Sequence, residues 1–399
     1  MRELRTLSWI VACGLLTAPA AWAQEQAQDE SAAKRTRLGL QVTDELRELK
    51  RDQAKERGWA LTVMSTAAVG FDSNIFNSPT SETDSLLYDL GLKLESLHYF
   101  GAQQSLKLSL EGAGSVYPES GKLDESTQRF RAKYSKRLGK RTRLSFSGMV
   151  KRANDDEVDI TGGAFTRDFE HYAYKAEPSI RYRLSKRQML ILSYSGEWKD
   201  YSETSGQNSL DWWAHGPLAR YRFKLGDAAS ITLGYGFTIR SYDEDLASLE
   251  DGTDLATNPN EEHYYHRVEL KGKWRPVSWL QLDGRYRFKK KDDQFEGFES
   301  YDEGKWAAGL SLSLFPSWTL RAQASLAERE YDHRPSDLAG ETLAYDKLEG
   351  SITAYYKISR GSSFYARYSY IDRDGNHDTG TSYRDYTTSR FLTGFSFAR

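Results

Sequence analysis

From Trp59 onward, apolar and polar residues alternate along this 399-residue chain, and no other feature constrains its fold as strongly. Between Met189 and Trp198, every second residue is apolar or glycine, and serine, glutamate and lysine recur on the opposite face. The stretches 231–240, 280–289 and 320–326 repeat this arrangement. A period of two places successive side chains on opposite faces of a β-strand, so these stretches predict strands with one apolar face.

The predicted strands are joined by connections of two kinds. The runs are about 10 to 14 residues long, which is long for a globular strand and typical of a strand tilted across a membrane. Tight connections are expected at 138–141, 185–188, 226–229, 276–279, 315–318 and 359–362, and long polar ones near 72–85, 118–125, 156–170, 202–209, 243–262, 292–304, 332–345 and 373–386. Short turns on one side and long loops on the other are the asymmetry of an outer-membrane barrel.

Residues 59–399 are therefore predicted to form an all-β fold, a transmembrane antiparallel up-and-down β-barrel. The run boundaries give about 16 strands, and 14 or 18 would also fit an even-numbered barrel. The aromatic residues Phe391, Phe395 and Phe397 share one face of the last strand. Pro178 and Pro217 fall inside predicted strands, where a missing N–H donor predicts a bulge or a shifted boundary.

The first 58 residues differ from the rest of the chain. Residues 1–23 read as a signal peptide, with an apolar core and a small-x-small site before Gln24, which predicts export. Together with the barrel pattern, this predicts a location in a Gram-negative outer membrane. Residues 24–58 form a polar leader with a short helix that Thr43 can cap and Gly58 can end. This leader is expected on the periplasmic side, where it could contact export partners, enter the barrel mouth or remain mobile.

The predicted export and the near-neutral net charge limit the classes of partner that this protein is expected to bind. The formal net charge is −2, so neither charge nor location favours nucleic acid, and the only cysteine, Cys13, lies inside the predicted signal. The chain fits a soluble secreted β-protein or a membrane barrel, and strand length favours the barrel. Outer-membrane lipids and lipopolysaccharide are then the expected surroundings of its apolar face.

The polar face of the strands is predicted to line a water-filled lumen. Bases outnumber acids on this face. The candidate anion path consists of Arg129, Arg131, Lys133, Lys175, Arg181, Lys199, Arg220, Lys271, Arg285, Arg287 and Lys289. A positive wall lowers the energy of an anion in a pore, which predicts a porin or transport channel for an anionic solute or an exopolysaccharide. The alternative is that these charges pair with acids across strands.

Catalytic and metal chemistry find little support in the sequence. The seven histidines fall mostly in loops or at strand ends, and no serine and acid are matched to His215, so no enzyme, cofactor or metal site is predicted. His263-x-x-His266 alone is a weak metal signal. The aromatic residues near strand ends predict interfacial girdles, with sugar stacking as the alternative; they are Tyr99, Tyr117, Tyr201, Trp212, Trp213, Tyr242, Trp274, Trp279, Trp318 and Tyr331.

A short motif, Val69-Gly-Phe-Asp-Ser-Asn-Ile-Phe76, ends the first predicted strand. Asp72, Ser73 and Asn74 are good turn formers, because their side chains can bond to nearby backbone N–H groups. The motif is therefore predicted to mark the outer end of strand one, with Val69 and Phe71 on the lipid face and Ile75 and Phe76 packed back against the barrel. A calcium clamp would need more oxygen ligands than this stretch supplies.

Gly70 to Ile75 resembles a signature of outer-membrane barrels of the beta-barrel porin 2 type, many of which occur with exopolysaccharide export systems. The barrels of surface lipoprotein assembly modifiers carry a similar string. This resemblance implies a role in polysaccharide export or, less closely, in the assembly of surface lipoproteins. Only about 35 residues lie between the predicted signal and the first strand, too few for the helical repeats that often precede such barrels, which favours a stand-alone barrel.

Overall fold

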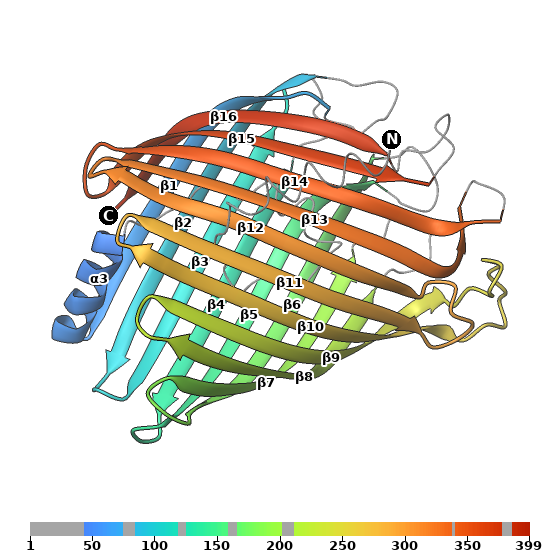
Figure 1. The fold of residues 1–399 in the computed structure, drawn as a ribbon, viewed down its shortest axis with the longest axis horizontal. Helices are drawn as coiled ribbons and strands as arrows, with labels where there is room; N and C mark the ends of the chain where they lie inside the picture. The colour runs from blue at the N-terminus through green and yellow to red at the C-terminus, as the bar shows by residue number, and fades with distance from the viewer. Residues whose placement is uncertain are drawn as a thin grey trace.

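The computed structural model describes residues 44–74, 84–118, 125–158, 166–201, 211–336, 340–376 and 385–399. These residues form one helix and a closed barrel of sixteen strands in which every neighbouring pair is antiparallel and β1 pairs with β16 (Figure 1). The elements are α3 (Asp44–Arg57), β1 (Trp59–Asp72), β2 (Ser85–Phe100), β3 (Gln104–Val116), β4 (Glu125–Arg137), β5 (Thr142–Val158), β6 (Thr166–Arg183), β7 (Gln188–Tyr201), β8 (Trp212–Leu225), β9 (Ala229–Leu246), β10 (Asn260–Val277), β11 (Leu280–Asp293), β12 (Tyr301–Phe315), β13 (Trp318–Pro335), β14 (Thr342–Lys357), β15 (Ser362–Gly375) and β16 (Tyr386–Ala398).

The predicted all-β barrel and its sixteen strands are confirmed. All six predicted tight connections fall at turns between strands, and these turns lie at one end of the barrel with α3 and the C-terminus (Figure 1). Some strands have the expected length, as β4 does with 13 residues, and others are longer, as β6 is with 18. Pairing continues past the alternating apolar runs into the polar segments that had been assigned to loops, because a ladder can extend beyond the membrane while both strands remain in register.

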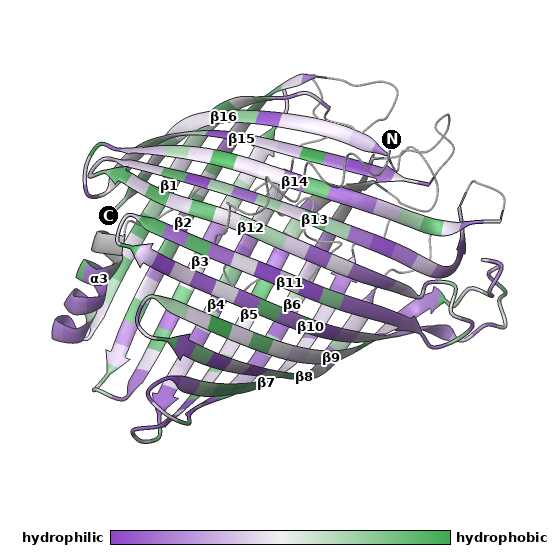
Figure 2. Ribbon diagram, viewed as in Figure 1, coloured by the Kyte–Doolittle hydropathy of each residue, from purple (hydrophilic) through white to green (hydrophobic). Residues whose placement is uncertain are grey.

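The alternation separates two faces of the wall. Along β1, Leu61, Val69 and Phe71 are 42 to 43% exposed, whereas Met64 and Thr66 between them are 2 and 4% exposed. The exposed apolar side chains form the outer, lipid-facing surface, and the intervening residues face the interior. Figure 2 shows the two kinds of residue alternating along the strands, with hydrophilic residues gathering toward the loop ends of β10 and β11. Val69 and Phe71 thus lie on the lipid face, as predicted.

The helix α3 packs beside β1 and β2 at the turn end of the barrel (Figure 1). Gly58 follows its last residue with φ of 80°, a left-handed conformation that glycine adopts without strain, so the predicted helix end is confirmed. The carbonyl of Gly58 accepts a hydrogen bond from the Tyr99 N–H at 2.8 Å, and Ala54 is fully buried. No helix in the described part of the chain is long and apolar enough to cross a membrane.

The two prolines neither create a bulge nor shift a strand boundary. Pro178 has a ladder partner on β5 but none on β7, and Pro217 has one on β7 but none on β9. The register is the same on both sides of each gap. The expected bulge is therefore wrong, because one missing N–H donor interrupts the ladder without displacing the strand.

The aromatic residues near strand ends divide between the two faces. Trp213, Trp274, Trp279 and Trp318 are 45 to 52% exposed on the outer surface, where they fit the predicted girdles. Tyr117, Trp212 and Tyr331 are at most 5% exposed and face the interior, so the girdle prediction is wrong for them. The position of an aromatic residue near a strand end therefore does not determine which face of the barrel it occupies. The face is set by the alternation of inner and outer positions along the strand.

Candidate functional site: the inner wall of the barrel

The structure places all eleven residues of the predicted anion path on the inner face. Each alternates with exposed outer residues of its own strand; Arg129 and Arg131, for example, flank Phe130, which is 43% exposed. The eleven come from β4 (Arg129, Arg131, Lys133), β6 (Lys175, Arg181), β7 (Lys199), β8 (Arg220), β10 (Lys271) and β11 (Arg285, Arg287, Lys289). They are spread around the wall and do not form one compact site.

Several of these bases pair with acids on neighbouring strands. The shortest contacts are Arg285 Nε to Glu269 Oε1 at 2.5 Å and Arg287 Nη2 to Glu303 Oε1 at 2.7 Å. Arg129 (to Glu111, 4.0 Å) and Lys175 (to Glu197, 3.2 Å) are also paired across strands, and Lys271 pairs with Glu269 on its own strand at 2.9 Å. On β10 to β12, charge pairing across strands therefore accounts for the bases at least as well as an anion path does.

The loop half of the interior carries an arrangement that the sequence reasoning missed. Eight consecutive strands, β8 to β15, each contribute one residue to a row in which aromatic and cationic side chains alternate. Each cation lies 4.1 to 5.1 Å from the centroid of the ring on a neighbouring strand. This aromatic–cation belt consists of Trp212, Arg240, Tyr265, Lys289, Tyr301, Arg329, Tyr345 and Arg373. Each such contact contributes about 0.5–2 kcal/mol, so the belt adds to the stability of the wall from β8 to β15.

Only Lys289 of the belt cations was among the predicted lining residues. Arg240, Arg329 and Arg373 could have been found by extending the alternation of each strand to its loop end, since all three occupy inner positions. The cation–ring pairs themselves could not have been found in this way. Arg329 and Tyr345 are direct ladder partners, and in the other pairs the ring lies two residues from the direct partner of the cation, so the contacts depend on how the strands are staggered in the closed barrel.

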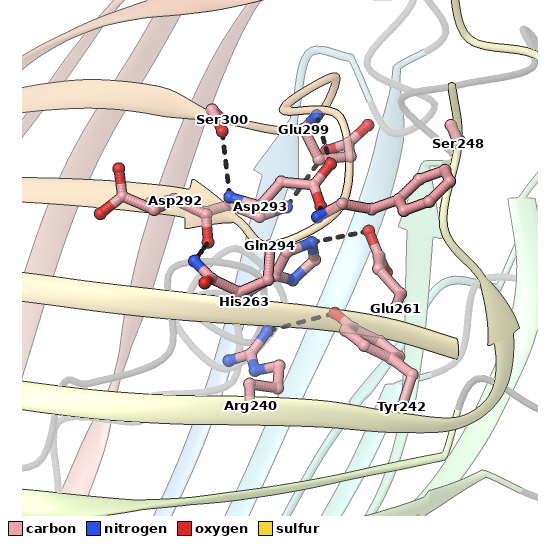
Figure 3. A network of polar contacts seen from close by, with 12 residues as sticks. Arg240, Tyr242, Ser248, Glu261, His263, Asp292, Asp293, Gln294, Glu299 and Ser300 are labelled. Atoms are coloured by element: carbon pink, nitrogen blue, oxygen red, sulfur yellow. Dashed lines mark hydrogen bonds and ion pairs between the residues drawn. The ribbon is translucent and has the colours of Figure 1, made fainter. Parts of the chain in front are cut away.

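At the loop end of the barrel, a buried polar network joins β9, β10 and the connection between β11 and β12 (Figure 3). His263 Nε2 lies 2.7 Å from Glu261 Oε1, and Arg240 Nη1 donates to the Tyr242 hydroxyl at 3.5 Å. Glu299, between β11 and β12, contacts Lys291 at 3.2 Å and Arg334 at 2.7 Å. Burial works against ionisation of Glu299, but the charges of Lys291 and Arg334 outweigh it and lower the pKa of its carboxyl to about 2.

His263 and His266 do not form a metal site. They lie three positions apart on β10 and so on opposite faces: His263 is buried inside, and His266 faces outward, where its Nδ1 lies 2.9 Å from the Tyr235 hydroxyl. Within the described ranges, no group of three histidine, cysteine, aspartate or glutamate residues is arranged to hold a metal ion.

The motif at the end of β1 forms the seam that closes the barrel. Asp72 faces inward, and its Oδ2 accepts hydrogen bonds from Arg390 on β16, from Nη2 at 2.6 Å and Nε at 3.0 Å. Its Oδ1 accepts from the Thr388 hydroxyl at 2.9 Å, and the Tyr117 hydroxyl lies 2.6 Å from Arg390 Nη2. The side chains of Asp72 and Arg390 are 3 and 9% exposed.

Ser73 and Asn74 extend this connection between the first and last strands. The Ser73 hydroxyl accepts a hydrogen bond from the Ser389 N–H at 2.9 Å, and the Asn74 side chain donates to the Thr387 carbonyl at 2.9 Å. The predicted local bond also exists, from the Asn74 N–H to Asp72 Oδ1 at 3.3 Å. The motif thus ends β1, as its turn-forming residues indicate, and also bonds β1 to β16. Ile75 and Phe76 lie outside the described residues.

Two glycines allow the seam strands to approach closely. A Cβ added at Gly70 would meet the Phe391 carbonyl oxygen and lie 2.5 Å from Leu392 Cδ2, and one at Gly394 would meet the Ala67 carbonyl oxygen and lie 2.6 Å from Ala68 Cβ. Any larger residue would have to displace the opposite backbone. Both glycines lie within the β1–β16 ladder, which pairs residues 64–72 with 390–398.

Comparison with known proteins found one family model and several solved structures that are similar to this chain. The family model described as "outer membrane beta-barrel porin, MtrB/PioB" matches residues 245–344. No curated protein matches the sequence. Similar solved structures include OccAB1 of Acinetobacter baumannii (10% identity, 85% of this chain and 96% of that chain, TM-score 0.49), an anion-selective porin from Comamonas acidovorans (10%, 86% and 100%, 0.46) and OmpT of Vibrio cholerae (12%, 86% and 98%, 0.46).

The barrel is closed and antiparallel, its outer surface is apolar, and its connections divide into short turns and long loops. These features together are typical of a barrel that spans an outer membrane. With the match over residues 245–344, they identify the chain as a porin-like β-barrel of the Gram-negative outer membrane.

Proposed function

We propose that the protein is a non-enzymatic channel that favours anions across the outer membrane. The observation that carries this proposal is the charge on the inner face of β4 to β8. Among side chains described there, the bases are Arg129, Arg131, Lys133, Arg137, Arg143, Lys151, Lys175, Arg181, Arg183, Lys199, Arg220, Arg222 and Lys224, and the acids are Glu125, Glu177 and Glu197. The inner face of β10 to β12 is more evenly balanced, as its ion pairs indicate.

A one-sided positive wall is sufficient to bias ion passage. In a water-filled pore at physiological salt, a charge acts over about 8 Å, so an ion must pass near β4 to β8 to be selected. There it meets bases that are in excess over the carboxylates of the same strands. Anions are stabilised along this part of the wall, and cations are repelled.

Planar-bilayer recordings test this proposal. Under a potassium chloride gradient, the reversal potential of the wild-type channel should have the sign of chloride preference. Replacing Arg220 and Arg222 on β8 with glutamine should reduce that preference, whereas Arg152→Gln on the outer face should not change it. A cation-selective wild-type channel would overturn the proposal.

The cargo is proposed to be an anionic solute or an exopolysaccharide, and the resemblance of Gly70 to Ile75 to export barrels supports the second. A general diffusion porin and a barrel that assists surface lipoprotein assembly are the alternatives. Deletion of the gene distinguishes them: loss of surface polysaccharide supports export, loss of surface lipoproteins supports assembly, and loss of neither supports a porin.

The leader, residues 24–58, is proposed as a contact for periplasmic export partners. Support comes from α3, which is held beside β1 and β2 at the turn end with Leu49 52% exposed. Replacing Leu49 with serine should weaken copurification of such a partner without changing conductance.

A further inference from the structure

We propose that the turn half of the inner wall, on β3 to β7, binds an acidic saccharide chain that enters from the periplasm. This inference rests on the proposed anion channel and adds to it a binding site, a substrate class and a direction. The site, called here the arginine–serine patch, consists of two neighbouring rows on the inner face: Arg137, Arg143 and Arg181, and Ser105, Ser135, Ser145, Ser179 and Ser193.

The arginine row places three like charges side by side. Arg143 on β5 is the direct ladder partner of Arg137 on β4 and of Arg181 on β6. Directly opposed side chains on neighbouring strands have Cβ atoms about 5 Å apart, and like charges in this position repel. In the described ranges, none of the three arginines forms an ion pair with a carboxylate, and Glu177, the acid on β6 nearest to Arg181 in sequence, lies four residues away. A bound anion would relieve this repulsion.

The serine row lies two residues further along each strand. Ladder partners connect Ser105, Ser135, Ser145, Ser179 and Ser193 across five consecutive strands, β3 to β7. Within the row, the hydroxyls of Ser135 and Ser145 lie 3.0 Å apart. Ser193 is 9% exposed, and its hydroxyl has no hydrogen-bond partner among the residues that the structure describes, which is costly for a buried polar group unless a ligand satisfies it.

The two rows together match the chemistry of an acidic saccharide. Guanidinium groups bind carboxylate, sulfate or phosphate oxygens through paired donors, and serine hydroxyls both donate to and accept from sugar hydroxyls. A small inorganic anion would use the arginines and leave the serine row unused. An acidic polypeptide would offer charge, but few hydroxyls for the serines.

The distribution of acids gives the direction. The loop end of β9 and the connection that follows it carry Asp243, Glu244, Glu250 and Asp251, whereas the turns beside the patch carry Lys140, Arg141, Lys186 and Arg187. A polyanion is therefore repelled at the loop end and attracted at the turn end, where the periplasmic leader also lies. The patch is placed to receive a chain that leaves the cell.

Side-specific block of single channels tests this inference. The probe is an oligomer of galacturonic acid, compared with an uncharged dextran oligomer and with polyglutamate of similar length. An Asp251→Cys variant and an impermeant thiol reagent report the orientation of each channel. Galacturonate oligomer should block from the turn side at a concentration at least about tenfold lower than from the loop side, and dextran should not block.

Three double variants distinguish binding at the arginine–serine patch from a general effect of lumen charge. Arg143→Gln with Arg181→Gln should raise the blocking concentration at least about tenfold, whereas Lys273→Gln with Arg275→Gln, which removes the same charge from the turn half of β10, should leave it within about twofold. Ser145→Ala with Ser193→Ala keeps every charge and should weaken galacturonate block without moving the reversal potential; it also serves if the arginine variant does not fold.

Several results would overturn the inference. These are equal block from both sides, unchanged block in the arginine or serine variants, or block by polyglutamate as strong as by galacturonate, which would make the partner a polypeptide. An anion-selective channel with any of these results keeps the proposed function and rejects only the saccharide site. A cation-selective channel rejects the proposed function itself.

Discussion

Replacing Asp72 with asparagine should weaken barrel closure strongly. The substitution keeps the size of the side chain but removes the charge that faces Arg390, whose side chain is 9% exposed and donates two hydrogen bonds to Asp72 Oδ2. Breaking a buried pair by removing one partner typically costs about 3–5 kcal/mol, because the remaining charge stays buried without its counter-charge. The variant should therefore assemble poorly, while channels that do assemble should conduct normally.

The assay is resistance of the folded barrel to heat and urea, read as the shift in gel mobility between folded and unfolded protein. Asp84→Asn, an exposed residue on the same side of the barrel, is the matched control and should change the free energy of unfolding by less than about 0.5 kcal/mol. Asp72→Leu with Arg390→Leu should recover most of the loss, since neither charge then remains buried. A loss below about 1 kcal/mol for Asp72→Asn, or normal assembly with altered conductance, would refute the reasoning.

Three further changes test other parts of the wall. Gly70→Ala should reduce the folded fraction on the mobility gel, because its Cβ would meet the Phe391 carbonyl, whereas Gly272→Ala, with nothing within 4 Å of the added Cβ, should not. Glu299→Gln should cost on the order of 2 kcal/mol in urea unfolding above pH 4.5; since the folded pKa of Glu299 is about 2, below its usual 4.5, this difference should shrink as the pH falls from 4.5 to 2, and a difference that persists at pH 2 would contradict the assignment. Tyr301→Leu should lower the free energy of unfolding by about 2 kcal/mol more than Tyr301→Phe, which keeps the ring between Lys289 and Arg329; equal losses would assign the effect to the hydroxyl.

The sequence by itself determined the barrel, its strand number and its tight turns. These features are local: a period of two assigns each residue to a face, and the turn residues mark where a strand reverses. The same period placed Arg285 and Lys289 on the inner face correctly. It could not show that Arg285 is tied to Glu269, or that Lys289 lies between two tyrosine rings, because those contacts depend on the stagger between neighbouring strands.

Only the tertiary structure decided what the motif at Asp72 does. Its turn-forming residues indicated the end of a strand, and that is where β1 ends, but its ion-pair partner Arg390 lies 318 residues away. The pair exists because the last strand closes the barrel against the first. The arginine and serine rows likewise become continuous only when β3 to β7 are set in register. A residue pattern repeats within a strand, whereas a site on a barrel wall runs across strands, so local sequence fixes the face and barrel closure fixes the neighbours.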